Sequence, residues 1–215
     1  MYLFVFELLG TIAFAVSGAT TGIRANMDVF GIACMALVTS TAGGVIRDVI
    51  LGITPPSAFS TPSLLLVGMV TGIVVFLIAY SHKKLKKPVA YDFVILCMDS
   101  AGLGLFTVLG AEAAYESGDP GLALVFFCGV ITGTGGGILR DVLSGQTPFV
   151  FRRHFYACAC LAGVLLYVLA RDVLGRDTAL LIASIAVFAI RLLAARYHWY
   201  LPNVNNDNHT ALSKG

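Results

Sequence analysis

The chain has 215 residues, of which 58% are apolar and only 12% are Asp, Glu, Lys or Arg. Soluble domains average about 45–50% apolar and about 25% charged residues, so this composition excludes an ordinary soluble protein. The formal net charge is only +2, and no basic stripe interleaved with aromatic residues is present, which excludes a typical nucleic-acid-binding surface. Long apolar runs instead indicate a protein that crosses a membrane several times.

Charged and turn residues divide the chain into seven apolar segments, each close to the roughly 20 residues that a membrane-spanning helix needs. In chain order the predicted spans are residues 3–23, 29–50, 62–80, 90–113, 121–143, 155–170 and 178–193. A membrane barrel would instead show segments of about 10 residues with alternating hydrophobicity. The predicted fold class is therefore an all-α polytopic membrane protein with seven transmembrane helices.

Basic residues in short loops indicate the cytoplasmic side of a membrane. The run from His82 to Lys87 contains four lysines and follows the third predicted span, so we expect it to be cytoplasmic. Alternation of the spans then places the N-terminus outside, the C-terminus in the cytoplasm, and Glu112 and Glu116 on the outer side. Residues 201–215 are predicted to form a polar, disordered cytoplasmic tail.

The chain contains an internal repeat. The pattern Gly-Gly-x-x-Arg-Asp-Val-x-x-Gly-x-Thr-Pro occurs at residues 43–55 and again, 93 positions later, at residues 136–148. Upstream of it, a shift of 92 positions aligns Glu7 with Asp99, Gly10 with Gly102, Phe14 with Phe106 and Gly18 with Gly110. Chance agreement over such a pattern is very improbable, so the sequence indicates a duplication.

Each copy of the repeat holds three predicted spans, an odd number. The second copy must therefore enter the membrane in the opposite direction, as in the inverted repeats of many transporters. We predict one transmembrane domain over residues 1–200, with repeat one at about 3–81, repeat two at about 90–173 and a seventh helix at about 178–197. The seventh helix lies outside the repeat.

Glycines cluster late in the second and fifth predicted spans. They are Gly43 and Gly44 in the first copy, and Gly135, Gly136 and Gly137 in the second. Glycine is less favourable in a helix than Ala by about 1 kcal/mol, so a kink or a break is one expectation. Close packing of helices through small residues is the other, and for glycine alone it is favoured.

An arginine and an aspartate follow each glycine group: Arg47 and Asp48, then Arg140 and Asp141. A charge at the bilayer centre costs at least about 2.5–3.5 kcal/mol, so such residues are paired or face water. Neighbours on a helix diverge by about 100°, which argues against pairing within each Arg-Asp unit. We expect cross-repeat pairs, Arg47 with Asp141 and Arg140 with Asp48.

Two alternatives to these cross-repeat pairs are open. The arginines could pair with the aligned carboxylates Glu7 and Asp99, or they could end the helices at the membrane interface by snorkelling.

Hydroxyl groups precede the glycines, namely Ser40 and Thr41 in the first copy and Thr132 and Thr134 in the second. Hydroxyl and carbonyl oxygens suit a weakly held monovalent cation that passes through a pore. The alternative is that these hydroxyls bond to the preceding turn of their own helix. The spacing alone does not separate the two interpretations.

The paired Gly-Gly-x-x-Arg-Asp segments, the three-plus-three repeat and the seventh span make the sequence resemble bacterial members of the trimeric intracellular cation (TRIC) channel family. The same domain has also been labelled a glycine transporter. The resemblance covers roughly residues 3–200 and implies a homotrimer in a bacterial inner membrane, with one pore per protomer between kinked second and fifth helices. The pore would conduct K⁺ and also Na⁺, without a cofactor. Ala42 stands where the family has a third glycine, so the first kink could be milder.

Two transport functions follow from these observations. The first is a passive cation channel, in which glycine-kinked helices and hydroxyls form the path. The second is a secondary transporter for glycine or another small solute, for which inverted repeats are a usual architecture. An enzyme is not expected, because neither a nucleophile with a partner base nor a metal-ligand set is visible. The predicted partners are further copies of the chain and membrane lipid.

Overall fold

The computed structural model describes residues 2–81, 88–118, 121–152, 155–197 and 199, and within these ranges it contains helices and no strands. The helices are α1 (Tyr2–Arg24), α2 (Val29–Ile50), α3 (Ser57–Ser60), α4 (Pro62–Ser81), α5 (Pro88–Glu116), α6 (Leu122–Leu143), α7 (Phe149–Arg152), α8 (Phe155–Leu174) and α9 (Arg176–Arg196). All except the four-residue α3 and α7 are long and apolar enough to cross a membrane. The predicted fold class is confirmed.

Several helices are longer than the predicted spans. Helix α5 continues to Glu116, beyond the predicted end at residue 113, and α8 continues to Leu174 and α9 to Arg196. The short helices α3 and α7 were not predicted, and each follows the Thr-Pro that ends a repeat motif. The lysine run at residues 82–87 and the tail at 201–215 lie outside the described residues.

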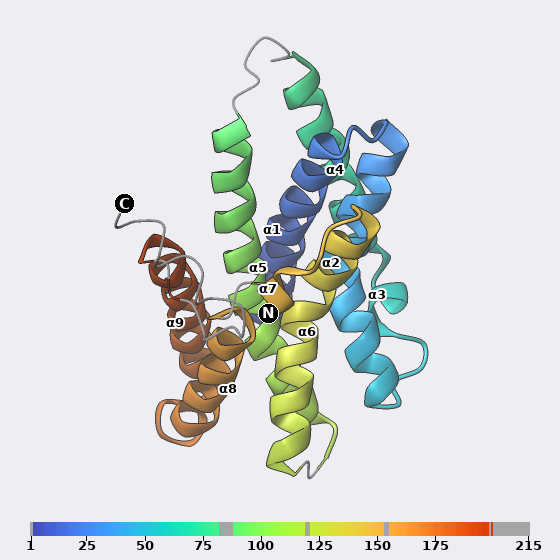
Figure 1. The fold of residues 1–215 in the computed structure, drawn as a ribbon. Coiled ribbons are helices and arrows are strands. Elements are labelled where there is room, and N and C mark those ends of the chain that lie inside the picture. The colour runs from blue at the N-terminus through green and yellow to red at the C-terminus, as the bar shows by residue number, and fades with distance from the viewer. Residues whose placement is uncertain (1, 82–87, 119–120, 153–154, 198, 200–215) are drawn as a thin grey trace, which may run out of the picture.

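Four long helices form the centre of the bundle. Helices α1, α2, α5 and α6 pack against one another, with α4 against α1 and α2 on one flank. Helices α8 and α9 pair on the opposite flank, where α9 contacts α5 (Figure 1). The seventh membrane helix, α9, therefore completes the side of the bundle formed by repeat two.

Aligned residues of the two repeats meet in the middle of the bundle. The rings of Phe14 and Phe106 stack with their centroids 5.3 Å apart. A Cβ added to Gly10 would contact the ring of Phe106, and one added to Gly102 would overlap the ring of Phe14. Such reciprocal contacts are those of a pseudo-twofold axis, as expected for an inverted repeat.

The glycine segments let α2 and α6 approach closely. A Cβ on Gly43 would overlap the carbonyl oxygen of Thr132, and one on Gly136 would overlap that of the aligned Thr39. A Cβ on Gly135 would lie 3.1 Å from the Cα of Gly43. Both helices continue through these residues, so the break that we considered does not occur. Close packing between helices accounts for these three glycines.

The glycine that ends each repeat motif has a different role. Gly52 and Gly145 both have φ of +72°, a conformation that glycine adopts without strain. Beyond them, Ile53 N–H donates to the Asp48 carbonyl and Gln146 N–H to the Asp141 carbonyl, each at 2.8 Å. These bonds are those of a Schellman motif, which ends α2 and α6 and turns the chain back toward the bundle.

Candidate functional site

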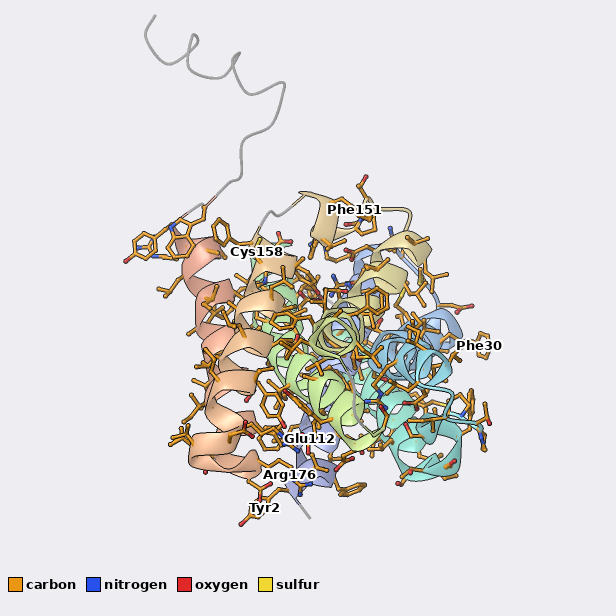
Figure 2. All side chains as sticks on the ribbon, turned by 90° about the horizontal axis from the view of Figure 1, so that it is seen from below. Tyr2, Phe30, Glu112, Phe151, Cys158 and Arg176 are labelled. Atoms are coloured by element: carbon orange, nitrogen blue, oxygen red, sulfur yellow. The ribbon has the colours of Figure 1, made fainter. Side chains whose placement is uncertain are left out.

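A cavity of about 430 Å³ lies at the end of the bundle where α1 begins and α5 ends. Its charged lining residues are Glu7, Arg47, Asp48, Glu112 and Glu116. Figure 2 shows Tyr2, Glu112 and Arg176 at this end and Phe151 and Cys158 at the other. Asp48 is paired with Arg47, and Glu112 and Glu116 are paired with arginines of α8 and α9, whereas Glu7 has no ion pair within the described residues. The lining still has more carboxylates than cationic groups, which favours cations in the cavity.

A narrower cavity of about 40 Å³ adjoins the large one. The two cavities share Glu7, Arg47 and Ser57 as lining residues. The narrow cavity is also lined by Thr11 of α1, Ser40, Thr41 and Gly44 of α2, and by Ala58, Leu64 and Phe106. The two cavities are neighbours beside α2, and the narrow one combines polar side chains with a larger apolar lining.

The predicted pore-lining residues divide between α2 and α6. Ser40, Thr41 and Gly44 of α2 line the narrow cavity, whereas neither cavity has a lining residue from α6. Thr132 and Thr134 are buried in the packed interior instead. Gly137 also faces protein, since a Cβ there would lie 2.7 Å from the Tyr156 hydroxyl. In this conformation the two aligned segments are therefore not equivalent.

Arg47 is held by the aspartate next to it. Its Nε donates to Asp48 Oδ1 at 2.8 Å, and one terminal nitrogen donates to the Ser57 hydroxyl at 3.2 Å. Asp48 Oδ2 accepts the backbone N–H of Ser57 at 2.7 Å. The carboxylate thus fixes both the arginine and the start of α3.

Arg140 forms a larger and fully enclosed cluster. Its Nε donates to Asp141 Oδ1 at 2.8 Å, and another nitrogen donates to Asp99 Oδ1 and the Ser17 hydroxyl, each at 2.6 Å. The Tyr156 hydroxyl donates to Asp99 at 3.1 Å. As in the first repeat, the second aspartate oxygen, Asp141 Oδ2, caps the following short helix by accepting the Phe149 N–H at 2.8 Å.

The predicted cross-repeat pairs, Arg47 with Asp141 and Arg140 with Asp48, are therefore wrong. Each arginine pairs with its own neighbour, because the long side chain overcomes the divergence of adjacent positions and the turn after the helix fixes the aspartate beside it. The snorkelling alternative is also wrong, since Arg47 is 7% exposed and Arg140 is 0% exposed. Of the aligned-carboxylate alternatives, the Arg140–Asp99 pair is present, whereas within the described residues Arg47 makes no ion pair with Glu7.

The hydroxyls before the glycines bond within their own helices. Thr41 donates to Leu37 O at 2.8 Å and Ser40 to the same carbonyl at 3.1 Å. Thr132 donates to Cys128 O at 2.6 Å, and Thr134 donates to Val130 O. The intrahelical interpretation is therefore correct for the hydrogen bonds that these hydroxyls donate. The oxygens of Ser40 and Thr41 keep acceptor lone pairs at the wall of the narrow cavity.

Glu112 is a candidate residue that the sequence interpretation missed. It is 1% exposed, accepts a hydrogen bond from Tyr167 and pairs with Arg171 of α8 at 3.3 Å. Arg176 of α9 lies 3.6 Å from it and 3.2 Å from Glu116. Its place inside α5 was the available signal: it follows a long apolar run without an intervening turn residue.

Seven apolar helices, inverted three-helix repeats and an acidic cavity entering the bundle define a polytopic membrane protein of the inverted-repeat class. The chain matches the family described as glycine transporter over residues 4–80 and 96–172, ranges that lie within the two repeats. The chain belongs to this family, the TRIC family.

Three similar proteins support this assignment. The inner membrane protein YadS of Escherichia coli K12 is 32% identical over 211 residues, which cover 97% of this chain and 99% of that protein. A prokaryotic TRIC channel crystallised in 0.5 M KCl superposes with a TM-score of 0.85 and 35% identity, over 94% of this chain and all of that one. The trimeric intracellular cation channel orthologue from Rhodobacter sphaeroides superposes with a TM-score of 0.83 and 33% identity, over 92% of this chain and 98% of that one.

The relatives and the seven apolar helices indicate the same cellular location. The seven apolar spans and an inner membrane protein among the relatives support a multi-pass protein of a bacterial inner membrane. The two solved structures are described as channels rather than as enzymes.

Proposed function

We propose that the chain is a channel for monovalent cations, K⁺ and also Na⁺, that works as a homotrimer with a separate path in each protomer. The observation that carries the proposal is the pair of adjoining cavities, in which four carboxylates lead to a narrow space walled by hydroxyl oxygens of α2. Carboxylates concentrate cations at an entrance, and hydroxyl oxygens replace part of an ion's hydration shell without holding it tightly.

The two ends of the proposed path are unlike in this conformation. The Arg47 end is open to the large cavity, whereas Arg140, Asp99 and Tyr156 fill the corresponding place in repeat two. We propose that this conformation is closed at the Arg140 end. Conduction would then require the Arg140 cluster to separate, or α6 to move away from α5 and α8.

The comparisons support the ion and the assembly. One solved relative is described as a cation channel orthologue that is trimeric, and another as a TRIC channel in KCl. The fold is shared over more than nine-tenths of this chain in both cases. We therefore propose further copies of the chain and membrane lipid as its partners, and K⁺ or Na⁺ as the permeant ion.

Planar-bilayer recording of the purified protein tests this proposal. In asymmetric KCl we expect resolved unitary currents with a reversal potential that shifts toward the K⁺ equilibrium potential, and smaller or equal currents when NaCl replaces KCl. Crosslinking of the protein in the membrane should give trimers as the largest abundant species. Absence of unitary currents from protein that is folded and trimeric would refute the channel.

A carrier for glycine is the second candidate, favoured by the family's description and by the inverted repeats. Substrate sites in such carriers use discontinuous helices, whose half-helix ends face the substrate. Helices α2 and α6 are continuous through their glycines, which favours the channel. Saturable glycine uptake by proteoliposomes, without unitary currents, would establish the carrier instead.

A further inference from the structure

We propose that Glu7 and Thr11 of α1, with Ser40 and Thr41 of α2, form a binding site for a single monovalent cation in the narrow cavity. The inference rests on the proposed function and assigns it a specific site. All four residues line the same cavity of about 40 Å³. About 10–15 Å³ of such volume holds one water-sized particle, so this space fits one ion with few waters.

The two residues from α1 have polar atoms that no protein group satisfies. Within the described part of the chain, neither the Glu7 carboxylate nor the Thr11 hydroxyl has a hydrogen-bond or ion-pair partner. Thr11 is nevertheless 3% exposed. The Thr11 hydroxyl lines the narrow cavity without a protein partner, so a water or an ion in that cavity would satisfy it.

The two residues from α2 present oxygen without a competing proton. Ser40 and Thr41 both donate their hydroxyl hydrogens to the Leu37 carbonyl of their own helix. A hydroxyl whose hydrogen is already donated in a hydrogen bond can act toward another ligand only as an acceptor. At the cavity wall these lone pairs suit a cation and not an anion.

Repeat two shows what the same positions look like without such a site. There the position of Glu7 is Asp99, which is paired with Arg140 at 2.6 Å. The positions of Thr11 and Ser40 are Leu103 and Gly133, which lack hydroxyls and are buried. The polar atoms therefore occur together only in the repeat that retains a cavity.

Arg47 is the residue that could compete with the ion for Glu7. It lines the same cavity but is fixed to Asp48 and to the hydroxyl of Ser57. In repeat two, Phe149 stands at the start of the equivalent helix α7, where repeat one has Ser57, and it has no hydroxyl. There Arg140 bonds to Asp99, the carboxylate aligned with Glu7. Ser57 therefore helps to keep Arg47 off Glu7 and leaves the carboxylate for a cation.

The site fits a monovalent ion better than a divalent one. In the narrow cavity Glu7 is the one carboxylate among the lining residues, and Arg47 adds a positive charge beside it. Calcium sites in proteins take six to eight oxygens, usually with several carboxylates. A single carboxylate with three hydroxyls gives the weaker hold that conduction requires.

Unitary conductance measured against K⁺ concentration tests the site. We expect Glu7→Gln to raise the half-saturating K⁺ concentration by about fivefold, the factor for losing one charge at about 4 Å in a water-like dielectric. Thr11→Val, which keeps the side-chain shape, should raise it less. The matched controls Asp92→Asn and Thr20→Val should leave it unchanged, because neither residue lines either cavity.

A binding measurement separates failure of the site from failure of the channel. The melting temperature of the wild type in detergent should rise with KCl relative to choline chloride, and this rise should be lost in Thr11→Val and Glu7→Gln but kept in both controls. If the wild type passes no current but shows this pattern, the proposed function fails and the site stands. If the wild type conducts and Thr11→Val keeps both its half-saturation and its K⁺-dependent rise, the site is wrong.

Discussion

Neighbouring residues of the repeat motif have opposite surroundings. A Cβ on Gly43 would overlap a backbone carbonyl of α6, whereas one on Gly44 would meet only an Arg47 nitrogen, at 3.9 Å. Gly44 also lines the narrow cavity. At the residue scale, one glycine of the pair therefore serves helix packing and the other leaves space in the proposed path.

Gly44→Val should block most K⁺ flux without unfolding the protein. The added side chain enters the narrow cavity, and the fold meets no overlap, so we expect stability to change by less than about 1 kcal/mol. Rubidium-86 uptake into proteoliposomes measures the flux, and melting temperature and trimer content measure the fold. Gly121→Val is the control, because Gly121 faces open space outside both cavities. Undiminished uptake by Gly44→Val would place the path elsewhere.

Gly43→Ala should instead weaken the fold. The methyl group must displace the Thr132 carbonyl of the packed α6, and overpacking of this kind costs about 1–3 kcal/mol. We expect a lower melting temperature and less trimer in detergent, with Gly121→Ala as the unaffected control. A stability equal to that of the wild type would mean that α2 and α6 can move apart at this contact without loss of stability.

At the element scale, the Arg-Asp units connect helices rather than end them. Arg140 of α6 binds Asp99 of α5 and Ser17 of α1, and Asp141 caps α7. Arg47 of α2 binds mainly Asp48 and the start of α3. The second copy of the motif thus links α6 to α5 and α1, whereas the first copy lies beside a cavity.

Arg140→Gln should destabilise the bundle strongly. Removing one partner of a buried pair leaves uncompensated charge and costs about 3–5 kcal/mol, here with two carboxylates left behind. The control Arg24→Gln breaks an exposed pair with Asp92, which is worth at most about 1 kcal/mol. Melting temperatures in detergent compare the two variants. Similar small losses for both would show that the Arg140 cluster contributes little to the fold.

At the scale of the whole molecule, an odd number of spans predicts that the two chain ends lie on opposite sides of the membrane, and the described residues contain seven helices able to span it. Tyr2 at the start of α1 and Tyr197 after α9 are both exposed. The lysine run at residues 82–87 predicts which side is which, with the start of α1 outside. The large acidic cavity would then open to the outside of the cell.

Cysteine labelling tests this orientation. In a variant without the five native cysteines, Tyr2→Cys should react with a membrane-impermeant maleimide in intact cells, and Tyr197→Cys should react only after permeabilisation. The reverse pattern would turn the acidic cavity toward the cytoplasm. Labelling of both sites in intact cells would contradict an odd number of spans.

The sequence by itself determined the spans, the duplication and its inversion. These follow from composition and from the spacing of like residues along one chain, and such local features survive folding unchanged. The motif also pointed to Arg47, Asp48, Arg140 and Asp141 as special. It could not name their partners, because the reach of an arginine and the turn that brings an aspartate beside it depend on the packed structure.

Only the tertiary structure decided which copy of the motif keeps a cavity. Both copies have an arginine and an aligned carboxylate, but the residues packed around them differ. Ser17 supports Arg140, whereas the aligned Leu109 lines the cavity beside Arg47. Glu7 consequently stays unpaired next to a buried Thr11, while Asp99 is held by Arg140. A near-symmetric sequence thus gives an asymmetric path, since the free energy of each charge depends on neighbours contributed by other helices.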